Sequence, residues 1–336
     1  MICIQGFDRS FVCVDAHLDQ HDPTGGDATG GWGSNEQLQD MGLLEGALRV
    51  FFCETLQSDG ETRSTPPGPD EHLVEVGRIR DTFMPPFVPD DWRRGVHFRY
   101  HVEGMESCDR LDDAKWLIDR LHEMGVRGFN PIYHPDNPLG GCSKESGKGL
   151  TELGRRVFTY AWAKGWWVDT AHMSDTSIAE TLTLRGDRRD WKLCYTHGGI
   201  QHDGIDHSAL VNGNIERCLT MDRALEIVRA GGLVCLSPAK PFYPGFGGVF
   251  VDHVRALLAE TRMHWCGVGI GTDYGGILDD WRFDGCETVG RLFEQLIVAL
   301  LGAGLTELQV RRVVGANAGI FFDLTEHSSS LASLLL

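Results

Sequence analysis

The sequence predicts a (β/α)8 TIM barrel, an α/β fold in which eight parallel strands alternate with helices. Eight short apolar runs follow one another along the 336 residues, and helix-like segments separate most of them without a break in composition. Most of these runs end close to a side chain that can bind a metal ion. A barrel builds its active site on one face, from the loops that follow the carboxyl ends of its strands. The recurring pattern is therefore typical of a single barrel.

The stretch 166–175 is the clearest example of this pattern. The apolar run 166–168 leads to His172, and Ser174 or Asp175 is placed to cap the helix that follows. His172 is therefore expected at the carboxyl-terminal tip of a strand. The same arrangement is expected at the ends of several other strands.

The strands are predicted from apolar, β-prone runs with a period of two. In the first strand this period points His17 and Asp19 in the same direction. The expected strands cover residues 11–16, 48–54, 96–102, 127–133, 166–168, 191–196, 233–236 and 264–271. The polar groups at their ends are His17 with Asp19, Glu103, His134, His172, His197 and Asp273.

Helices are predicted where apolar residues recur with helical spacing. In the segment 110–124, Leu117, Leu121 and Met124 share one face, and Gly125 ends the helix. The expected helices cover residues 74–84, 110–124, 151–164, 176–184, 220–230, 250–261, 289–302 and 305–314. One domain is expected over residues 1–336, with a surface excursion at 57–71 and a small apolar tail at 328–336.

The composition is that of an acidic protein. Asp and Glu outnumber Lys and Arg by 48 to 31, so the formal net charge is −17. This charge argues against nucleic acid or an anionic membrane surface as the main partner. The apolar stretch 296–301 is far too short to span a bilayer, and the first residues lack the features of a secretory signal. A cytoplasmic location is expected, and a homodimer is left open.

The cysteines are expected to pack as free thiols. The chain has 10 of them, none in a Cys-x-x-Cys pair, and half lie in apolar strand-like runs. Buried free thiols behave as small hydrophobic groups. A reducing compartment is therefore favoured over a disulfide framework.

The polar strand ends suggest a metal centre only when they are considered together. A single histidine or carboxylate at a strand end is most often a solvated or hydrogen-bonded side chain. Together, however, the strand ends carry three histidines, two aspartates and one glutamate, with His134 beside them. So many potential ligands at one end of the strands favour a metal site over ordinary side chains. Imidazole nitrogen combined with carboxylate oxygen suits Zn²⁺ or a similar divalent ion. A set that includes a bridging glutamate can hold two ions about 3.5–4 Å apart, and Asp273 could then act as the base toward water.

These motifs resemble the membrane (renal-type) dipeptidase family of the amidohydrolase superfamily. They run in family order from residue 11 to about residue 322, and their combination is specific although no single segment is. The matching segments are Asp15-Ala-His17-Leu-Asp19, Val102-Glu103-Gly104, Gly125-Val-Arg-Gly128, Tyr133-His134-Pro-Asp-Asn137-Pro-Leu-Gly140, Gly149-Leu-Thr151-Glu-Leu-Gly154, Val168-Asp-Thr-Ala-His172-Met-Ser-Asp175, Tyr195-Thr-His197, Gly269-Ile-Gly-Thr-Asp273-Tyr-Gly275 and Gly315-Ala-Asn317.

The resemblance implies a TIM barrel of the metal-dependent amidohydrolase type, with two Zn²⁺ ions per chain. His17 and Asp19 resemble the ligands of one ion. Glu103 resembles the carboxylate that bridges the two ions. His172 and His197 resemble the ligands of the second ion.

The resemblance also implies catalytic and substrate-binding residues. Asp273 resembles the acidic residue near the first metal, and it is expected to bind substrate and move a proton. His134 resembles the histidine that contacts the tetrahedral intermediate, which makes it both catalytic and substrate-binding. Arg217 stands in the sequence context of the arginine that binds the carboxylate of the substrate.

Three departures from the family pattern lie near the expected substrate side. The Gly-rich segment 198–207 replaces a small Ser-rich turn, and it lengthens the chain before Arg217. Gly275 stands where the family usually has an acidic residue, and the region between the first and third strands is short. The resemblance therefore specifies the substrate less well than it specifies the metal ligands.

The expected function is therefore a dinuclear zinc-dependent hydrolase of a small amide or peptide bond. A dipeptidase that uses a metal-bridging hydroxide is the preferred interpretation. A related amidohydrolase acting on an N-acyl amino acid or a cyclic amide is the alternative within enzymes. A catalytically silent metal-binding scaffold is the alternative of another class.

Overall fold

The structure of the protein is a computed structural model. It describes residues 13–20, 46–52, 97–105, 107–133, 135–144, 147–201, 215–239, 242, 249–261, 267–273 and 289–324. Only the backbone is described for residues 15, 17–20, 46–52, 97, 98, 249 and 289. The segments 57–71, 74–84 and 328–336, for which an excursion, a helix and a tail are expected, lie outside these ranges.

Eight parallel strands form one sheet in the centre of the molecule, in the order β1-β2-β3-β4-β5-β6-β9-β10. In the part of the chain that the structure describes, no hydrogen-bonded ladder joins β10 to β1. Their Cα atoms nevertheless approach within 8 Å, so the two edges of the sheet meet. The predicted barrel is confirmed. Its strands are β1 (Val14–Gln20), β2 (Gly46–Phe52), β3 (His97–Glu103), β4 (Val126–Asn130), β5 (Trp167–Asp169), β6 (Leu193–Tyr195), β9 (Leu233–Leu236) and β10 (Val268–Ile270).

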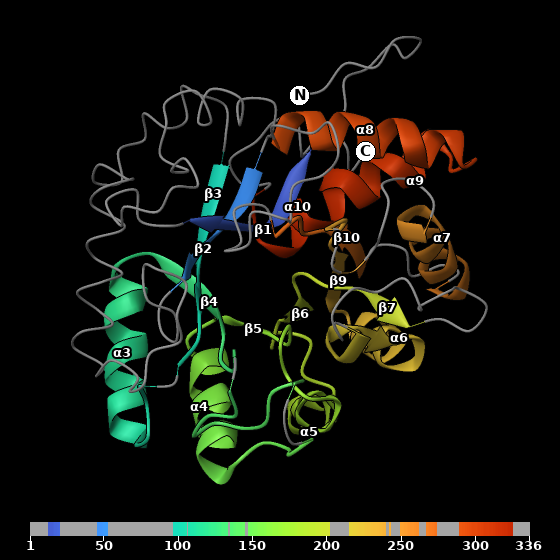
Figure 1. Cartoon of the computed structure of the whole chain (residues 1–336). Coiled ribbons are helices and arrows are strands. Elements are labelled where there is room, and N and C mark those ends of the chain that lie inside the picture. Colours follow the sequence, from blue (N-terminus) through green and yellow to red (C-terminus); the bar gives the residue numbers. More distant parts are fainter. Residues whose placement is uncertain are drawn as a thin grey trace, which may run out of the picture.

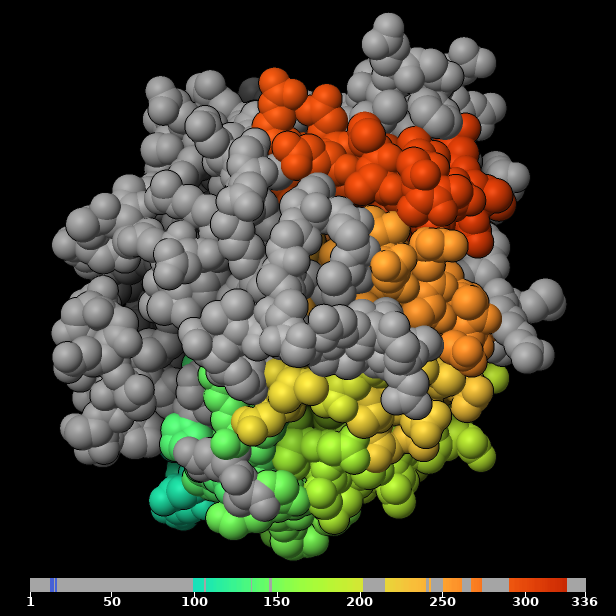
Figure 2. Space-filling model, turned by 45° about the vertical axis from the view of Figure 1, so that its right-hand side comes forward, coloured from blue at the N-terminus to red at the C-terminus, as the bar shows by residue number. Residues whose placement is uncertain are grey.

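Helices surround the strands, as Figure 1 shows. Side-chain oxygens of Thr151, Ser174 and Thr220 accept hydrogen bonds from the first turns of three helices, which sets where these helices begin. In Figure 2 the segments from α4 to α8 follow one another across one side of the molecule, in colour order from green to red. The helices are α3 (Leu111–Glu123), α4 (Glu152–Ala163), α5 (Asp175–Arg185), α6 (Met221–Arg229), α7 (Val249–Thr261), α8 (Val289–Gly302), α9 (Glu307–Arg311) and α10 (Asn317–Phe321).

The strands divide their side chains between two apolar clusters. In β6, Leu193 and Tyr195 belong to the larger cluster, which includes the helices, whereas Cys194 belongs to the smaller one. In β9, Val234 and Leu236 likewise join the larger cluster, whereas the residues on either side of Val234 join the smaller one. Because successive side chains of a strand point to opposite faces, the smaller cluster lies inside the barrel.

Helix α10 closes the end of the barrel where the strands begin. Asn317 donates a hydrogen bond to the carbonyl of Val268, the first residue of β10, over 2.7 Å. The side chain of Lys192, which directly precedes β6, donates to the carbonyl of Phe321. Phe322 packs against Trp167 in the smaller cluster. The opposite end, where the strands finish, remains for the candidate site.

The observed elements differ from the expected ones mainly at their ends. β1 extends to Gln20, so His17 and Asp19 lie within the strand rather than after it. The pairing of β1 with β2 shifts register between Asp15 and Leu18, which is a bulge at the level of His17. The helix expected over 305–314 is observed as α9 and the start of a π-helical segment (Arg312–Ala316), and α10 continues beyond it. The strand ends differ because a strand ends where its pairing with neighbouring strands ends, and the apolar run in the sequence does not show where that is.

Two further expectations concern cysteines and membranes. The cysteines that the structure describes are buried in the core, as expected from their positions in apolar runs, namely Cys13, Cys108, Cys142, Cys194, Cys218 and Cys235. None of the described helices combines the length and the apolar character that a membrane crossing requires.

Candidate metal centre

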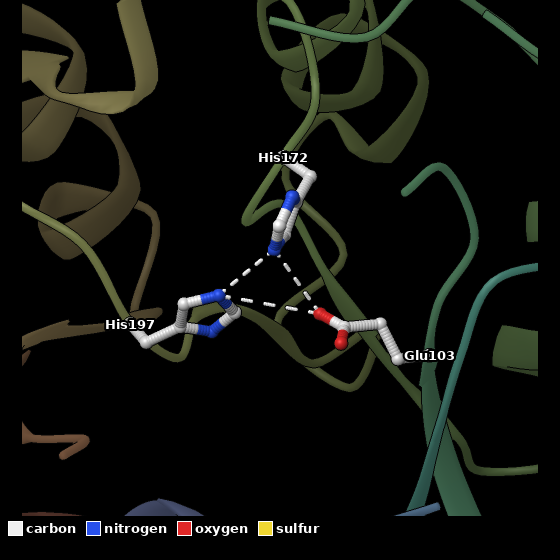
Figure 3. A group of neighbouring side chains, drawn as sticks. All are labelled: Glu103, His172 and His197. Atoms are coloured by element: carbon white, nitrogen blue, oxygen red, sulfur yellow. Dashed lines mark hydrogen bonds and ion pairs between the residues drawn. The ribbon is translucent and has the colours of Figure 1, made fainter. Parts of the chain in front are cut away.

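Three of the predicted metal ligands converge at the carboxyl ends of the strands. Glu103 is the last residue of β3, His172 follows β5 by three residues, and His197 follows β6 by two. Figure 3 shows their side chains pointing toward one another from three separate segments. All three are almost completely buried, with exposed fractions of 4% or less.

The donor atoms of the cluster are close enough to share one metal ion. The two Nε2 atoms of His172 and His197 lie 2.9 Å apart, and Oε1 of Glu103 lies 3.3 Å and 4.0 Å from them. Two ligands of a tetrahedral Zn²⁺, each about 2.0–2.1 Å from it, are separated by about 3.3 Å. Two imidazole nitrogens with one carboxylate oxygen are also the donor types that Zn²⁺ prefers. Both the chemistry and the spacing of these residues therefore fit a divalent ion.

His172 is held in the site by its backbone as well as its ring. Its φ angle is +67°, in the left-handed region that non-glycine residues seldom adopt. Its carbonyl accepts a hydrogen bond from the backbone N–H of Ser143 over 2.7 Å, and the Tyr133 ring lies 4.3 Å from its own ring, between centroids. Unusual backbone conformations of this kind gather at functional sites.

A small second sheet brings Arg217 next to His197. Strand β7 (Ile200–Gln201) follows His197, strand β8 (Leu219–Thr220) follows Arg217, and the two strands pair in parallel. The hydroxyl of Tyr195 donates a hydrogen bond to the carbonyl of Arg217 over 2.5 Å. The segment between the two strands is described only at its ends, because residues 202–214 lie outside the described ranges.

The guanidinium of Arg217 lies inside the cluster. Its Nη2 atom is 2.8 Å from Nε2 of His172 and 2.8 Å from Nε2 of His197. A guanidinium can only donate hydrogen bonds, so these imidazole nitrogens face it as acceptors. The group also lies 5.2 Å from the ring centroid of Phe242. Its Nε atom is buried and has no hydrogen-bond partner among the residues that the structure describes.

Asp273 is buried at the tip of the last strand. It follows β10 by three residues and has a φ angle of +56°, again in the left-handed region. The adjacent Thr272 carbonyl accepts a hydrogen bond from the hydroxyl of Ser237, which ties this tip to the end of β9. Asp273 does not belong to the compact group of three donors.

Other predicted site residues are less fully described. His134 lies outside the described residues. For His17 and Asp19 the structure describes the backbone of β1, not the side chains. Their proposed contacts with a metal therefore stay predictions.

The structure adds buried polar residues that the sequence did not single out. Asn130, at the end of β4, lies 3.3 Å from Oε1 of Glu103 and donates to the carbonyl of Ala171 over 2.7 Å. Asp169, the last residue of β5, is hydrogen-bonded to Thr196, which follows β6, and the Thr196 hydroxyl lies 3.1 Å from Nδ1 of His197. The signal that could have found them is their position, because each is a polar residue at or just after the end of an apolar strand-like run.

Burial has different effects on the ionisable groups around the cluster. It raises the pKa of Cys218 to about 12, so this thiol is neutral despite the nearby Arg217. Burial also raises the pKa of Asp169, but hydrogen bonds from His101 and Thr196 outweigh it and hold that pKa below its usual range. Asp169 is therefore a buried carboxylate.

Several solved structures share this fold. A metallo peptidase from Rhodobacter sphaeroides, liganded with a phosphinate mimic of the dipeptide L-Ala-D-Ala, has 18% identity and a TM-score of 0.71, over 93% of this chain and 99% of its own. A dipeptidase of metallopeptidase family M19 has 18% identity and a TM-score of 0.68, over 95% and 100%. An amidohydrolase from Pseudomonas aeruginosa has 16% identity and a TM-score of 0.66, over 93% and 95%.

These similarities extend over nearly the whole length of each chain. They support the barrel architecture, which the resemblance to the renal-type dipeptidase family also predicted. At 16–18% identity they carry the fold and do not by themselves carry the activity. No protein-family model matches the sequence.

If the cluster binds a metal, Zn²⁺ will stabilise the chelator-treated protein against unfolding. A ligand at 100 times its Kd adds about 2.7 kcal/mol to the free energy of unfolding. The His197→Ala variant should lose most of this zinc-induced stabilisation, measured as the shift in urea midpoint. The matched control is His253→Ala, which removes an equally buried histidine on α7. The metal assignment is wrong if zinc shifts the two variants equally.

Proposed function

We propose that this chain is a metal-dependent hydrolase of small amide or peptide bonds, and that dipeptides are its preferred substrates. The observation that carries the proposal is the buried group of Glu103, His172 and His197 at the strand ends. It lies at the face on which TIM barrels carry their active sites. The dipeptidase and metallo peptidase among the similar structures support the choice of reaction.

In this proposal the chain holds two Zn²⁺ ions. Glu103, His172 and His197 would hold one, His17 with Asp19 on β1 would hold the other, and Glu103 would contribute to both. Bound zinc would polarise the substrate carbonyl and lower the pKa of water toward about 7.

The side chains of the protein then complete the reaction. The Asp273 carboxylate accepts a proton from the attacking water and delivers it to the departing amine. His134 donates a hydrogen bond to the carbonyl oxygen as negative charge develops there. The burial of the cluster excludes bulk water, which strengthens both electrostatic interactions.

Arg217 is the proposed anchor for the carboxylate of the substrate. It is the arginine whose guanidinium contacts the ligand histidines, and its Nε atom has no hydrogen-bond partner in the described part of the chain. A metal ion bound through Nε2 of both histidines would displace Nη2 from them, and Nε and Nη2 together could then bind the two oxygens of a carboxylate. A free carboxyl group is a feature that dipeptides share with N-acyl amino acids.

The substrate class is tested with a panel of small amides. Zinc-loaded protein should hydrolyse dipeptides, with L-Ala-D-Ala included, and chelation should abolish turnover. Faster hydrolysis of N-acyl amino acids or cyclic amides would move the assignment to a related amidohydrolase. Zinc binding without turnover of any member would indicate the silent metal-binding scaffold.

Replacing Asp273 by Asn should reduce turnover without removing the metals. An amide of the same size cannot accept the proton, and loss of a general acid–base lowers kcat by about 10²–10⁴-fold. Zinc content and kcat are measured on the same sample. The matched control is Asp323→Asn, because Asp323 also has a left-handed backbone, with φ of +55°, but pairs with Lys192 away from the site.

Two other results would change this assignment of Asp273. Loss of one metal, with activity restored by excess Zn²⁺, would make Asp273 a ligand instead. Full activity with both metals bound would remove it from the mechanism.

Replacing Arg217 by Met should raise KM for dipeptides with a free carboxyl group and matter little for their carboxamides. The difference arises because only the carboxylate can form the charged pair. Steady-state kinetics on both substrates measures it. The control is Arg223→Met, an arginine paired with Asp175 at the surface. Equal losses on acid and amide would contradict the assignment and favour a structural role for Arg217.

A further inference from the structure

A layer of buried polar residues lies beneath the candidate metal centre, and the proposed reaction does not use it. His101, Asp169 and Thr196 each have an exposed fraction of 0%. His101 and Asp169 belong to β3 and β5, and Thr196 directly follows β6. They lie between the apolar interior of the barrel and the cluster of Glu103, His172 and His197. An ion-pair contact between His101 and Asp169 and the hydrogen bonds between Asp169 and Thr196 connect them, and the donor and acceptor of each contact can be assigned.

The assignment starts at Trp167, whose indole N–H can only donate a hydrogen bond. It lies 3.0 Å from Nδ1 of His101, so Nδ1 is an acceptor and carries no proton. The proton of the ring is therefore on Nε2, which lies 3.4 Å from Oδ2 of Asp169. Gly128 makes this arrangement possible, since a Cβ atom there would lie 1.9 Å from the indole nitrogen.

Asp169 is surrounded by donors and acts only as an acceptor. Its Oδ1 atom accepts from the backbone N–H groups of Ala171 and Thr196, each over 3.0 Å. Its Oδ2 atom lies 2.5 Å from Oγ1 of Thr196. A carboxylate has no proton to offer, so the single hydroxyl proton of Thr196 points to Asp169.

Thr196 then has only acceptor capacity left for His197. Its Oγ1 atom lies 3.1 Å from Nδ1 of His197. Because the hydroxyl proton is already committed to Asp169, Nδ1 of His197 must carry the proton. The Nε2 atom of a neutral His197 is then an unprotonated lone pair.

The other side of the His197 ring leads independently to the same tautomer. Nε2 lies 2.8 Å from Nη2 of Arg217, which can only donate, so Nε2 is an acceptor. Nε2 is also the atom that faces His172 and Glu103. The contact of Thr196 with Nδ1 and the contact of Arg217 with Nε2 therefore assign the same tautomer to His197.

We propose that Asp169 and Thr196 form a positioning pair, which holds the neutral His197 ring in the tautomer that binds metal through Nε2. The Thr196 hydroxyl contacts the ring of His197, and Asp169 acts through Thr196 by orienting that hydroxyl group. The inference rests on the zinc site of the proposed function. Hydrogen bonds to the far nitrogen of a ligand histidine usually contribute about 10–100-fold to metal affinity.

The test compares Thr196→Val with Thr196→Ser. Valine keeps the shape of threonine but cannot accept a hydrogen bond, whereas serine keeps the hydroxyl group. Zinc affinity, measured by competition with a chromophoric chelator, should fall by about 10–100-fold in Thr196→Val and stay close to the wild-type value in Thr196→Ser. The control is Thr181→Val, which removes another fully buried hydroxyl, bonded to the Ser177 carbonyl within α5.

A second measurement on zinc-free protein separates positioning from general destabilisation. Because Arg217 selects the same tautomer from the other side of the ring, nitrogen-15 NMR of the imidazole rings is recorded in the Arg217→Met background. His197 should be the Nδ1–H tautomer in Arg217→Met and in Arg217→Met/Thr196→Ser, and a mixture in Arg217→Met/Thr196→Val. An unchanged tautomer in Arg217→Met/Thr196→Val and unchanged zinc affinity in Thr196→Val would overturn the inference. If wild-type protein binds no zinc, the proposed function fails instead, and the tautomer measurement still decides the role of Thr196.

Discussion

The buried carboxylate of Asp169 is the constraint on which the centre of the barrel depends. An unpaired charge in a protein interior costs several kcal/mol, so its neighbours have to supply donors. They come from β3, β5 and the end of β6: the His101 ring, the Ala171 and Thr196 backbones, and the Thr196 hydroxyl. Satisfying one charge therefore sets the relative positions of three strands.

The interior of the barrel is ordered in layers along its axis. Apolar side chains and α10 close the end where the strands begin, and the layer of His101, Asp169 and Thr196 follows. The group of Glu103, His172 and His197 lies at the other end. Each layer limits the freedom of the next, because side chains with satisfied hydrogen bonds cannot turn without losing them. This order gives the loop residue His197 the support of a rigid sheet.

The sequence alone was sufficient for the barrel and for the meeting of Glu103, His172 and His197. Eight apolar runs separated by helical segments leave few alternatives, and parallel strands necessarily bring their carboxyl ends to one face. The helix starts at Ser174 and Thr220 were similarly readable, since capping depends on local residues. These features depend on the periodicity of apolar residues and on neighbouring residues, both of which can be read from the sequence.

Only the tertiary structure decided how the groups face each other. The approach of Arg217 to both histidines depends on the pairing of β7 with β8, which brings together two segments that are separated by residues 202–214 in the sequence. The direction of the hydrogen bonds from Trp167 through Asp169 to His197 depends on strands that are distant in sequence. The bulge near His17 and the left-handed backbone of His172 and Asp273 likewise result from packing. The spacing of residues along the chain identifies the residues of the site. Contacts between strands determine which atom of each residue can bind a metal ion or a substrate.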